Sequence, residues 1–271
     1  MSLSLFLYLG FGLFVLILLV WGAVSFRSQN VFGARELVAS ARSRTTGRLS
    51  QANELSDTQK RLLTFCLLPS HLRHETLLSL KVGTLSAEEI KSQLNREFGL
   101  DSRDAILAQL DYLLSGMRST TLDNDLINST VRAQDARKAV AAALILSPQC
   151  INAIDSTYAW DLGEAAELSK LAHAAGYLTK VELWNYLEQI SDGAQRFGRD
   201  WYEYTLSYLL GRVLDGNSIE DVTNQIYEIF HLPGDVAKRI PGINAYIRFR
   251  FTINKDGTGM NIRSAEHPQH C

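Results

Sequence analysis

Hydrophobic and polar residues follow three different patterns along this chain. Residues 3–26 contain no charged side chain, and the first charge in the sequence is that of Arg27. Over residues 56–244, apolar positions recur every three or four residues, which is typical of amphipathic helices. Residues 246–253 instead alternate apolar and polar side chains, as a half-buried strand does. The patterns predict a mainly α protein with one N-terminal transmembrane helix, an irregular multi-helix domain and a small C-terminal β-hairpin.

The uncharged run is long enough to cross a lipid bilayer. A transmembrane helix needs roughly 20 apolar residues, and the run from Leu3 to Phe26 is longer than that. A cleaved signal peptide would have a basic start, a shorter apolar core and small residues at its end, whereas this run has no basic side chain before it and ends in a bulky one. We therefore predict a transmembrane anchor over residues 1–26, with lipid contacts through residues 3–26.

Residues 27–55 set the expected orientation of that anchor. They contain five arginines and two glutamates, and basic flanks of membrane helices stay on the cytoplasmic side. We interpret them as a basic juxtamembrane linker. The prediction is a single-pass membrane protein, with its N-terminus outside and its C-terminal domain in the cytoplasm.

Residues 56–244 carry repeated helix start and stop signals. Ser86 with Glu89 and Thr179 with Glu182 have the spacing of capping boxes, in which each side chain bonds a backbone N–H at the helix start. Gly99 and Gly176 stand where left-handed C-terminal caps are expected. Short helices joined by brief loops predict an irregular helical domain rather than a coiled coil.

The segment 245–263 is predicted to form the β-hairpin, with residues 254–259 as its turn. Because an isolated hairpin is only marginally stable in water, it should lie on the helices or pair with another chain. Residues 264–271 are expected to be a flexible tail. The predicted apolar face consists of Ile247, Phe249, Phe251 and Ile253, and the predicted polar face of Tyr246, Arg248, Arg250 and Thr252.

Charge and motifs narrow the function classes. The formal net charge is −2 and the sequence pI is about 6.3, which argues against a nucleic-acid partner. The sequence has no phosphate-binding loop, dinucleotide fingerprint, nucleophile elbow or CxxC pair, so we expect no cofactor. His71, His74 and Glu75 do not have the order of a zinc-protease motif, so we expect no metal site there. We expect a protein partner.

Two carboxylates are the main candidates for chemistry. Asp161 and Glu164 lie three residues apart on one expected helix face, where they could bind a cation or divide acid and base roles. His173 is a further weak catalytic candidate. The structural alternative is that Asp161 lies in the first turn of its helix and pairs with Arg212 across the bundle, while His173 suits the negative end of the same helix.

Aromatic residues supply candidate binding positions. At helical spacing such residues belong more often to a core than to a ligand groove, and both alternatives remain open at this stage. The candidate binding residues are Trp160, Tyr177, Trp184, Trp201 and Arg212.

Several short stretches carry a family resemblance. They are FGLDSRD at 98–104 with LDYL at 110–113, and AWDLG at 159–163 with AGYL at 175–178, LW at 183–184 and LGR at 210–212. Together they resemble the YbeU/YbeR-like bacterial family, a domain of unknown function, over residues 94–215. The resemblance implies a helical fold and no known activity, cofactor or catalytic residue. Because the family is bacterial, it also implies that the predicted anchor lies in a bacterial inner membrane. In that family an arginine stands where this chain has Glu164, and a basic residue stands at Lys170.

Three functions fit these observations. The first is a non-enzymatic, membrane-anchored protein whose cytoplasmic helical domain binds or scaffolds another protein. The second is a hydrolase or metal-dependent enzyme that uses Asp161 and Glu164 in a pocket. The third is an immunity or accessory factor in interbacterial competition, which rests on analogy. An open acidic pocket at Asp161 would favour an enzyme, whereas burial of Asp161 against an arginine would favour a non-enzymatic role.

Overall fold

A computed structural model describes residues 55–72, 78–198 and 200–220, together with Tyr246, Phe249 and Phe251. The chain divides into two units, residues 1–47 and 48–271, and every described residue belongs to the second unit. The predicted anchor and the predicted tail lie outside the described residues, as does the linker apart from Leu55. Within the described ranges, no helix combines the length and the apolar character that a membrane crossing requires.

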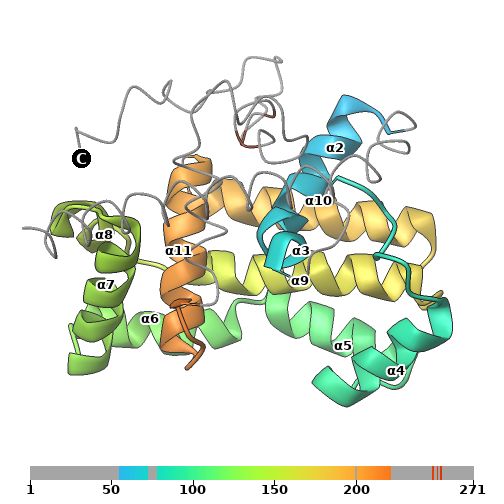
Figure 1. Cartoon of the computed structure of the whole chain (residues 1–271), viewed down its shortest axis with the longest axis horizontal. Helices are drawn as coiled ribbons and strands as arrows, with labels where there is room; N and C mark the ends of the chain where they lie inside the picture. Colours follow the sequence, from blue (N-terminus) through green and yellow to red (C-terminus); the bar gives the residue numbers. More distant parts are fainter. Residues whose placement is uncertain are drawn as a thin grey trace, which may run out of the picture. The chain divides into compact units, whose positions relative to one another are not determined.

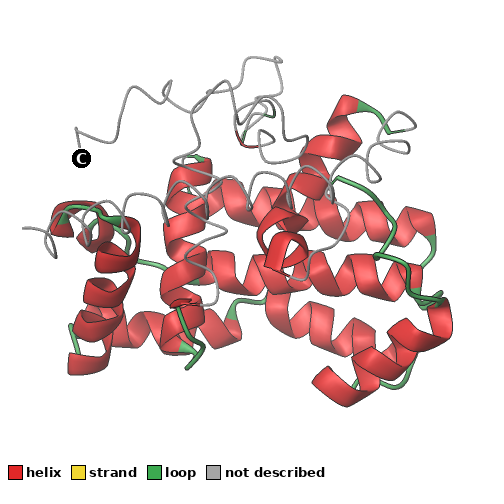
Figure 2. Ribbon diagram, viewed as in Figure 1, coloured by secondary structure: helices red, strands yellow, loops and turns green. Residues whose placement is uncertain are grey.

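The described residues form helices and contain no strand (Figures 1 and 2). This confirms the prediction of a mainly α fold. The helices are α2 (Asp57–Leu63), the 3-10 helix η2 (Thr64–Cys66), α3 (Leu67–Leu72), α4 (Ala87–Phe98), α5 (Arg103–Leu114), α6 (Met117–Ile127), α7 (Val131–Leu144), α8 (Pro148–Asn152), α9 (Tyr158–Ala174), α10 (Lys180–Phe197) and α11 (Trp201–Leu214).

Local signals fixed several helix ends as predicted. Ser86 begins α4 and Thr179 begins α10, and each forms a complete capping box with the residue three positions later. Gly99 ends α4 in the left-handed conformation with φ 69°. Gly176, with φ 83°, follows the last residues of α9. Glycine suits both positions because it has no side chain to strain a positive φ.

Helix α9 is the centre of the described domain. It packs against α11, α10, α5, α4, α6, α3 and η2, and in Figure 1 it lies between α10 and α5 with α11 crossing it. Gly163 lets α11 approach closely, because a Cβ on this residue would lie 2.5 Å from Tyr208 Cε2. Gly211 on α11 faces the Trp160 side chain in the same way. Small residues at the crossing therefore bring the two helix backbones together.

The predicted β-hairpin at 245–263 lies mostly outside the described residues. Its three described members, Tyr246, Phe249 and Phe251, are not in a strand and are all buried. The prediction that Tyr246 faces away from the two phenylalanines is therefore wrong. Its ring stacks on Trp201. This tertiary contact buries Tyr246, although the alternation in the sequence placed it on the polar face.

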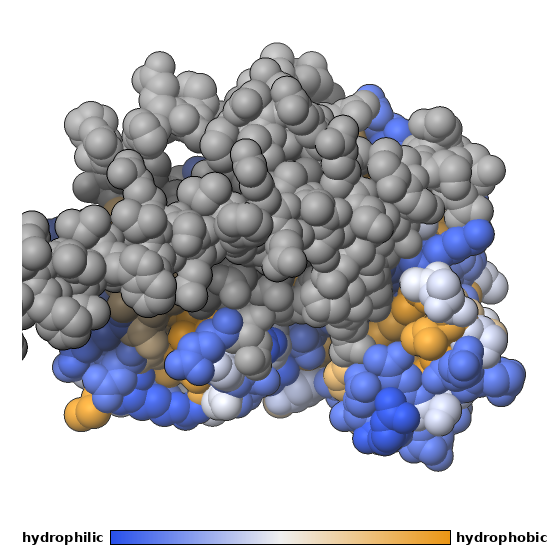
Figure 3. Space-filling view, in the orientation of Figure 1, coloured by the Kyte–Doolittle hydropathy of each residue, from blue (hydrophilic) through white to orange (hydrophobic). Residues whose placement is uncertain are grey.

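The described residues on one face of the domain are mainly polar (Figure 3). On the face drawn in Figure 3 the described residues are largely hydrophilic, with smaller apolar areas between them. This distribution agrees with amphipathic helices that surround the buried α9.

Candidate functional site

Asp161 is fully buried and both of its carboxylate oxygens are engaged. Its side chain is 0 % exposed. Arg118 Nε donates to Oδ1 at 2.5 Å, and the backbone N–H of Ser119 donates to Oδ2 at 2.9 Å. Arg118 and Ser119 lie in the first turn of α6, whose N-cap residue, Gly116, provides no side-chain hydrogen bond. Asp161 from α9 therefore caps α6 across the helix interface, where free N–H groups and the helix dipole favour an anion.

The predicted pair between Asp161 and Arg212 is wrong. The guanidinium that contacts Asp161 belongs to Arg118, which lies 43 residues earlier in the sequence. Arg212 Nε donates to the Ser218 carbonyl at 3.3 Å, and its Cζ lies 5.8 Å from the centre of the Trp160 ring. The expected burial of Asp161 against an arginine is correct, whereas the identity of that arginine depended on helix packing.

Asp215 joins this network from the end of α11. Its Oδ2 accepts a hydrogen bond from Trp160 Nε1 at 3.0 Å and contacts Arg118 Nη1 at 3.3 Å. The guanidinium of Arg118 also lies over the Trp160 ring, at 5.1 Å from its centre. Arg118 therefore connects the buried Asp161 with Asp215 at the surface, and the network joins α6, α9 and α11.

A second aspartate links α6 and α9. Here α6 supplies the carboxylate and α9 supplies the helix N-terminus. Asp123 on α6 accepts hydrogen bonds from the backbone N–H and the hydroxyl of Thr157, both at 2.6 Å, and from the Ser156 hydroxyl at 2.9 Å. Thr157 is the N-cap residue of α9. Burial raises the pKa of Asp123, and the hydrogen bonds from Thr157 and Ser156 oppose that rise. Asp123 therefore holds the start of α9, as Asp161 holds the start of α6.

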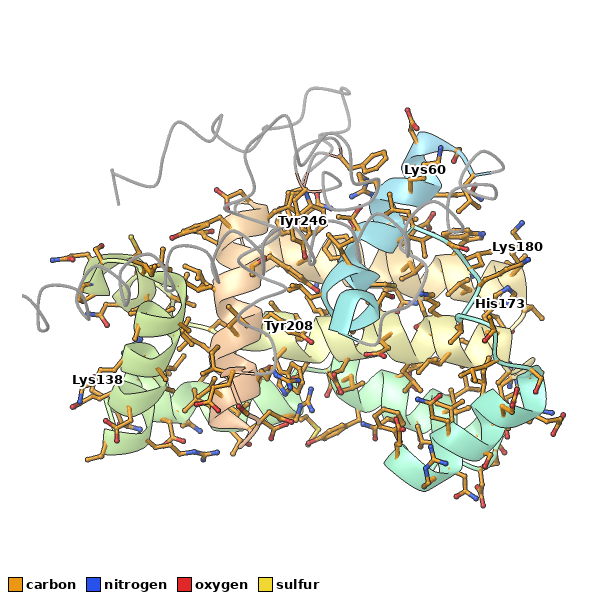
Figure 4. The ribbon with its side chains drawn as sticks, viewed as in Figure 1. Lys60, Lys138, His173, Lys180, Tyr208 and Tyr246 are labelled. Atoms are coloured by element: carbon orange, nitrogen blue, oxygen red, sulfur yellow. The ribbon has the colours of Figure 1, made fainter. Side chains whose placement is uncertain are left out.

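The three catalytic candidates do not meet at one place. Asp161 contacts α6, whereas Glu164 lies near Tyr208 on α11. Burial is the main cause that raises the pKa of Tyr208, and the charge of Glu164 adds to the rise. His173 lies in the last turn of α9, about 18 Å from Asp161 at the usual helical rise. Figure 4 shows His173 well separated from Tyr208. The arrangement does not bring an acid, a base and a histidine together.

His173 has a structural contact at the end of α9. Its Nδ1 lies 3.0 Å from the Leu178 carbonyl oxygen. Because a carbonyl can only accept, Nδ1 carries the proton and donates. The contact fastens the chain that follows α9 to its last turn.

The five candidate binding residues have different surroundings. Trp160 belongs to the network with Asp215 and Arg118, and the Arg212 guanidinium lies near its ring. Tyr177 donates its hydroxyl to the Asp101 carbonyl at 3.1 Å, while Trp201 is 0 % exposed and packs among other aromatic rings. Trp184 is half-buried on α10, and its Nε1 has no hydrogen-bond partner among the described residues. These separate environments indicate packing positions rather than a single ligand groove.

The burial of Lys170 was not predicted from the sequence. Lys170 on α9 is 1 % exposed, and its Nζ donates to the Ser70 hydroxyl of α3 at 2.9 Å. Glu167, one turn earlier, is 4 % exposed. The sequence gives little sign that Lys170 is buried, because a lysine in a helix usually lies on its solvent face.

Among the described residues, no group of three or more His, Cys, Asp or Glu side chains is arranged to hold a metal ion.

An aromatic cluster lies at another part of the domain. Trp201 is its centre, with Phe65 at 4.8 Å, Tyr246 at 4.8 Å and Phe251 at 4.9 Å between ring centres. Tyr204 completes the cluster at 5.7 Å from Trp201. Burial raises the pKa of Tyr204 and of Tyr246 well above the usual range of tyrosine. Both phenols therefore stay neutral, as a buried apolar cluster requires.

Comparisons with known proteins identify a family and give no functional relative. No curated protein matches the chain, and no solved structure does. The model of the family described as "Protein of unknown function (DUF1266)" matches residues 93–232, more than half of the 271-residue chain. The matched region includes the network of Asp161 and Asp123, but not Phe65 or the C-terminal aromatics. The resemblance to the YbeU/YbeR-like family stays a prediction. The chain belongs to the DUF1266 family.

Proposed function

We propose that this protein is a non-enzymatic, membrane-anchored protein whose helical domain binds another protein at the cytoplasmic face of a bacterial inner membrane. The observation that carries the proposal is the state of Asp161, the foremost catalytic candidate. A general acid or base must reach substrate or water, but this carboxylate is fully buried and bonded to Arg118 and Ser119. Asp161, on which the enzyme hypothesis depended, therefore has a structural role.

The sequence of the N-terminal region supports the location. Residues 3–26 are uncharged and residues 27–55 are rich in arginine, the pattern of a membrane helix with a cytoplasmic flank. An anchor concentrates the helical domain at the membrane, where binding to a second protein would be a sufficient function. An immunity or accessory role would be one form of such binding.

Exposed apolar side chains support a protein partner. Ile127 ends α6 and Val131 begins α7, and they are 72 % and 73 % exposed. Ile145 at the end of α7 is 82 % exposed and has φ 54°. A β-branched residue rarely adopts this left-handed conformation, and strained residues of this kind cluster at functional sites. Apolar areas are also visible on the described surface in Figure 3.

Location and partner binding can be tested separately. Fusion of a fluorescent protein and of alkaline phosphatase to the C-terminus reports the side of the membrane on which the domain lies. We expect fluorescence without phosphatase activity, together with membrane retention after a salt wash. Release of the full chain by salt, or an active phosphatase fusion, would contradict the proposed anchor or its orientation.

Partner binding is tested by photo-crosslinking in living cells. A photoreactive amino acid replaces Ile127 or Val131, and the matched control replaces Lys138, an exposed polar position of α7. We expect a discrete crosslinked band at the apolar positions that is absent at the control. Equal labelling at all three positions would contradict a specific contact. A hydrolytic activity of the purified chain that is lost in a folded Asp161→Asn variant would favour the enzyme alternative.

A further inference from the structure

The three described C-terminal residues are bound to the domain as a ligand would be. Tyr246, Phe249 and Phe251 are 3 %, 6 % and 1 % exposed. The surface that contacts them consists of Arg61 and Phe65 at the start of the domain and of Trp201 and Tyr204 on α11. We call these four residues the docking surface. Figure 4 shows Tyr246 between α11 and the region of α2 and α3.

The ring contacts select aromatic side chains. Tyr246 stacks on Trp201 with an interplanar angle of 27°. Phe251 meets Trp201 edge to face, at 83°, and its ring centre lies 6.0 Å from those of Phe65 and Tyr204. Stacked and edge-to-face arrangements are those that aromatic rings prefer. An aliphatic side chain would fill the space but would lose this geometry.

Main-chain contacts accompany the ring contacts. Trp201 Nε1 donates to the Phe249 carbonyl at 2.7 Å, and Arg61 Nη1 donates to the Phe251 carbonyl at 3.4 Å. Both donors are side chains of the docking surface, and both acceptors are backbone atoms of the bound residues. Peptide-binding domains divide recognition in the same way, because backbone hydrogen bonds give affinity and side-chain pockets give specificity.

Two acidic side chains lie beside the docking surface. Glu188 and Asp192 on α10 lie near enough to Arg61 to act on its guanidinium, and α10 is exposed at both acidic positions. The bound residues come from a segment whose sequence includes Arg248 and Arg250. An acidic rim beside an aromatic surface favours a ligand that is both basic and aromatic.

We infer that the docking surface is a peptide-binding site for basic segments with aromatic residues at the first, fourth and sixth positions, and that residues 246, 249 and 251 occupy it within the same chain. The inference rests on the proposed protein-binding function and names the chemistry of the partner. A partner segment of this kind would bind by displacing the chain's own residues. Because those residues are tethered, they compete at an effective concentration on the order of mM.

Peptide binding to the full chain tests this inference. The purified chain in mild detergent is titrated into a fluorescein-labelled peptide of sequence AYIRFRFTI, which corresponds to residues 245–253, and anisotropy is recorded. The double variant Phe249→Ala/Phe251→Ala should bind the peptide on the order of 100-fold more tightly than the unmodified chain, because the tethered competitor is weakened. A peptide with alanine at its tyrosine and both phenylalanine positions is the matched control and should not bind.

A second measurement does not depend on a variant that loses core contacts. A protease site is inserted into the full chain between residues 232 and 240, and the folded protein is then cut. The C-terminal fragment should stay bound during gel filtration, and excess AYIRFRFTI peptide should release it, whereas the alanine peptide should not.

Immediate loss of the fragment after cutting would overturn the inference, as would equal effects of the two peptides. The photo-crosslinks at Ile127 and Val131 report the proposed function independently of the docking surface. If those crosslinks form while the peptide does not bind, the inference is wrong and the proposed function stands.

Discussion

The Asp161 carboxylate of α9 accepts a hydrogen bond from the backbone N–H of Ser119, three residues into α6, at 2.9 Å. This contact replaces the side-chain cap that Gly116 cannot provide. Asp123 of α6 makes the reverse contact with Thr157 at the start of α9. Each of the two helices therefore has a carboxylate of the other helix at its N-terminus.

Loss of the Asp161 carboxylate should strongly destabilise the domain. Asp161→Ala leaves the Arg118 guanidinium and the Ser119 N–H without their buried acceptor, and we expect a loss of about 3–5 kcal/mol in the free energy of unfolding. Urea denaturation followed by circular dichroism measures it. The control is Asp135→Ala, which removes an exposed pair with Lys138 at 3.2 Å and should change stability by less than about 1 kcal/mol. Similar urea midpoints for the two variants would refute the capping role.

Stability should depend on pH through Asp123. Burial raises its pKa in the folded state, so the folded protein holds this proton more tightly than the unfolded chain does. The protonated carboxyl of Asp123 therefore contributes stability. This contribution is fully present below the pKa of aspartate in the unfolded chain, about 3.9, and is lost as the pH rises through the pKa of Asp123 in the folded protein.

The Asp123→Asn variant isolates this effect. We expect the free energy of unfolding of the unmodified chain, relative to that variant, to increase as the pH falls from 7 toward about 4. Urea titrations at a series of pH values provide the comparison. If the difference in the free energy of unfolding between the two proteins stays constant, or grows toward higher pH, the pKa of Asp123 is not raised in the folded protein.

Gly163 should not tolerate a methyl group. A Cβ there would lie 2.5 Å from Tyr208 Cε2 and 2.8 Å from Cδ2, so Gly163→Ala forces α9 and α11 apart. Overpacking of this kind costs about 1–3 kcal/mol, which exceeds the gain of about 0.5–1 kcal/mol from replacing a helical glycine.

Gly193→Ala is the matched control, because its nearest neighbours are side-chain atoms of Leu162 and Tyr158 at 3.3 Å or more. Thermal unfolding should show a lower Tm for Gly163→Ala and little change for Gly193→Ala. If both variants melt alike, the close crossing of α9 and α11 does not constrain residue 163.

Relief of strain at Ile145 should stabilise the domain. This residue ends α7 with φ 54°, where glycine has no steric penalty. Ile145→Gly should therefore raise the free energy of unfolding by about 1 kcal/mol, as measured in urea. Ile145→Ala keeps a Cβ in the left-handed region and serves as control.

Helix boundaries were predictable from sequence to a large extent. The capping boxes at Ser86 and Thr179 operate within one turn, so that the interacting atoms are already neighbours in the sequence. The mainly α class followed from apolar periodicity for the same local reason. Burial of the C-terminal aromatics was predicted for Phe249 and Phe251 but not for Tyr246, because ring stacking on Trp201 is a long-range contact.

The candidate site was much less predictable. The sequence singled out Asp161 and offered Arg212 as its partner, but it gave no reason to select Arg118. Both arginines carry the same charge, and only the packing of α6 against α9 decides which one reaches the carboxylate. Burial of Lys170 likewise depends on α3, which covers α9 from a distant part of the chain.

The sequence by itself determined the helical class, the positions of several caps and the pattern of an uncharged N-terminal run followed by arginines. These properties depend on the order of neighbouring residues and on their local chemistry. Tertiary structure alone decided that Asp161 and Asp123 cap each other's helices and that the C-terminal aromatics bind Trp201. The physical reason is that a buried charge or ring is stabilised by whatever partner lies within a few ångströms in space, and spatial proximity is set by packing around α9 rather than by spacing along the chain.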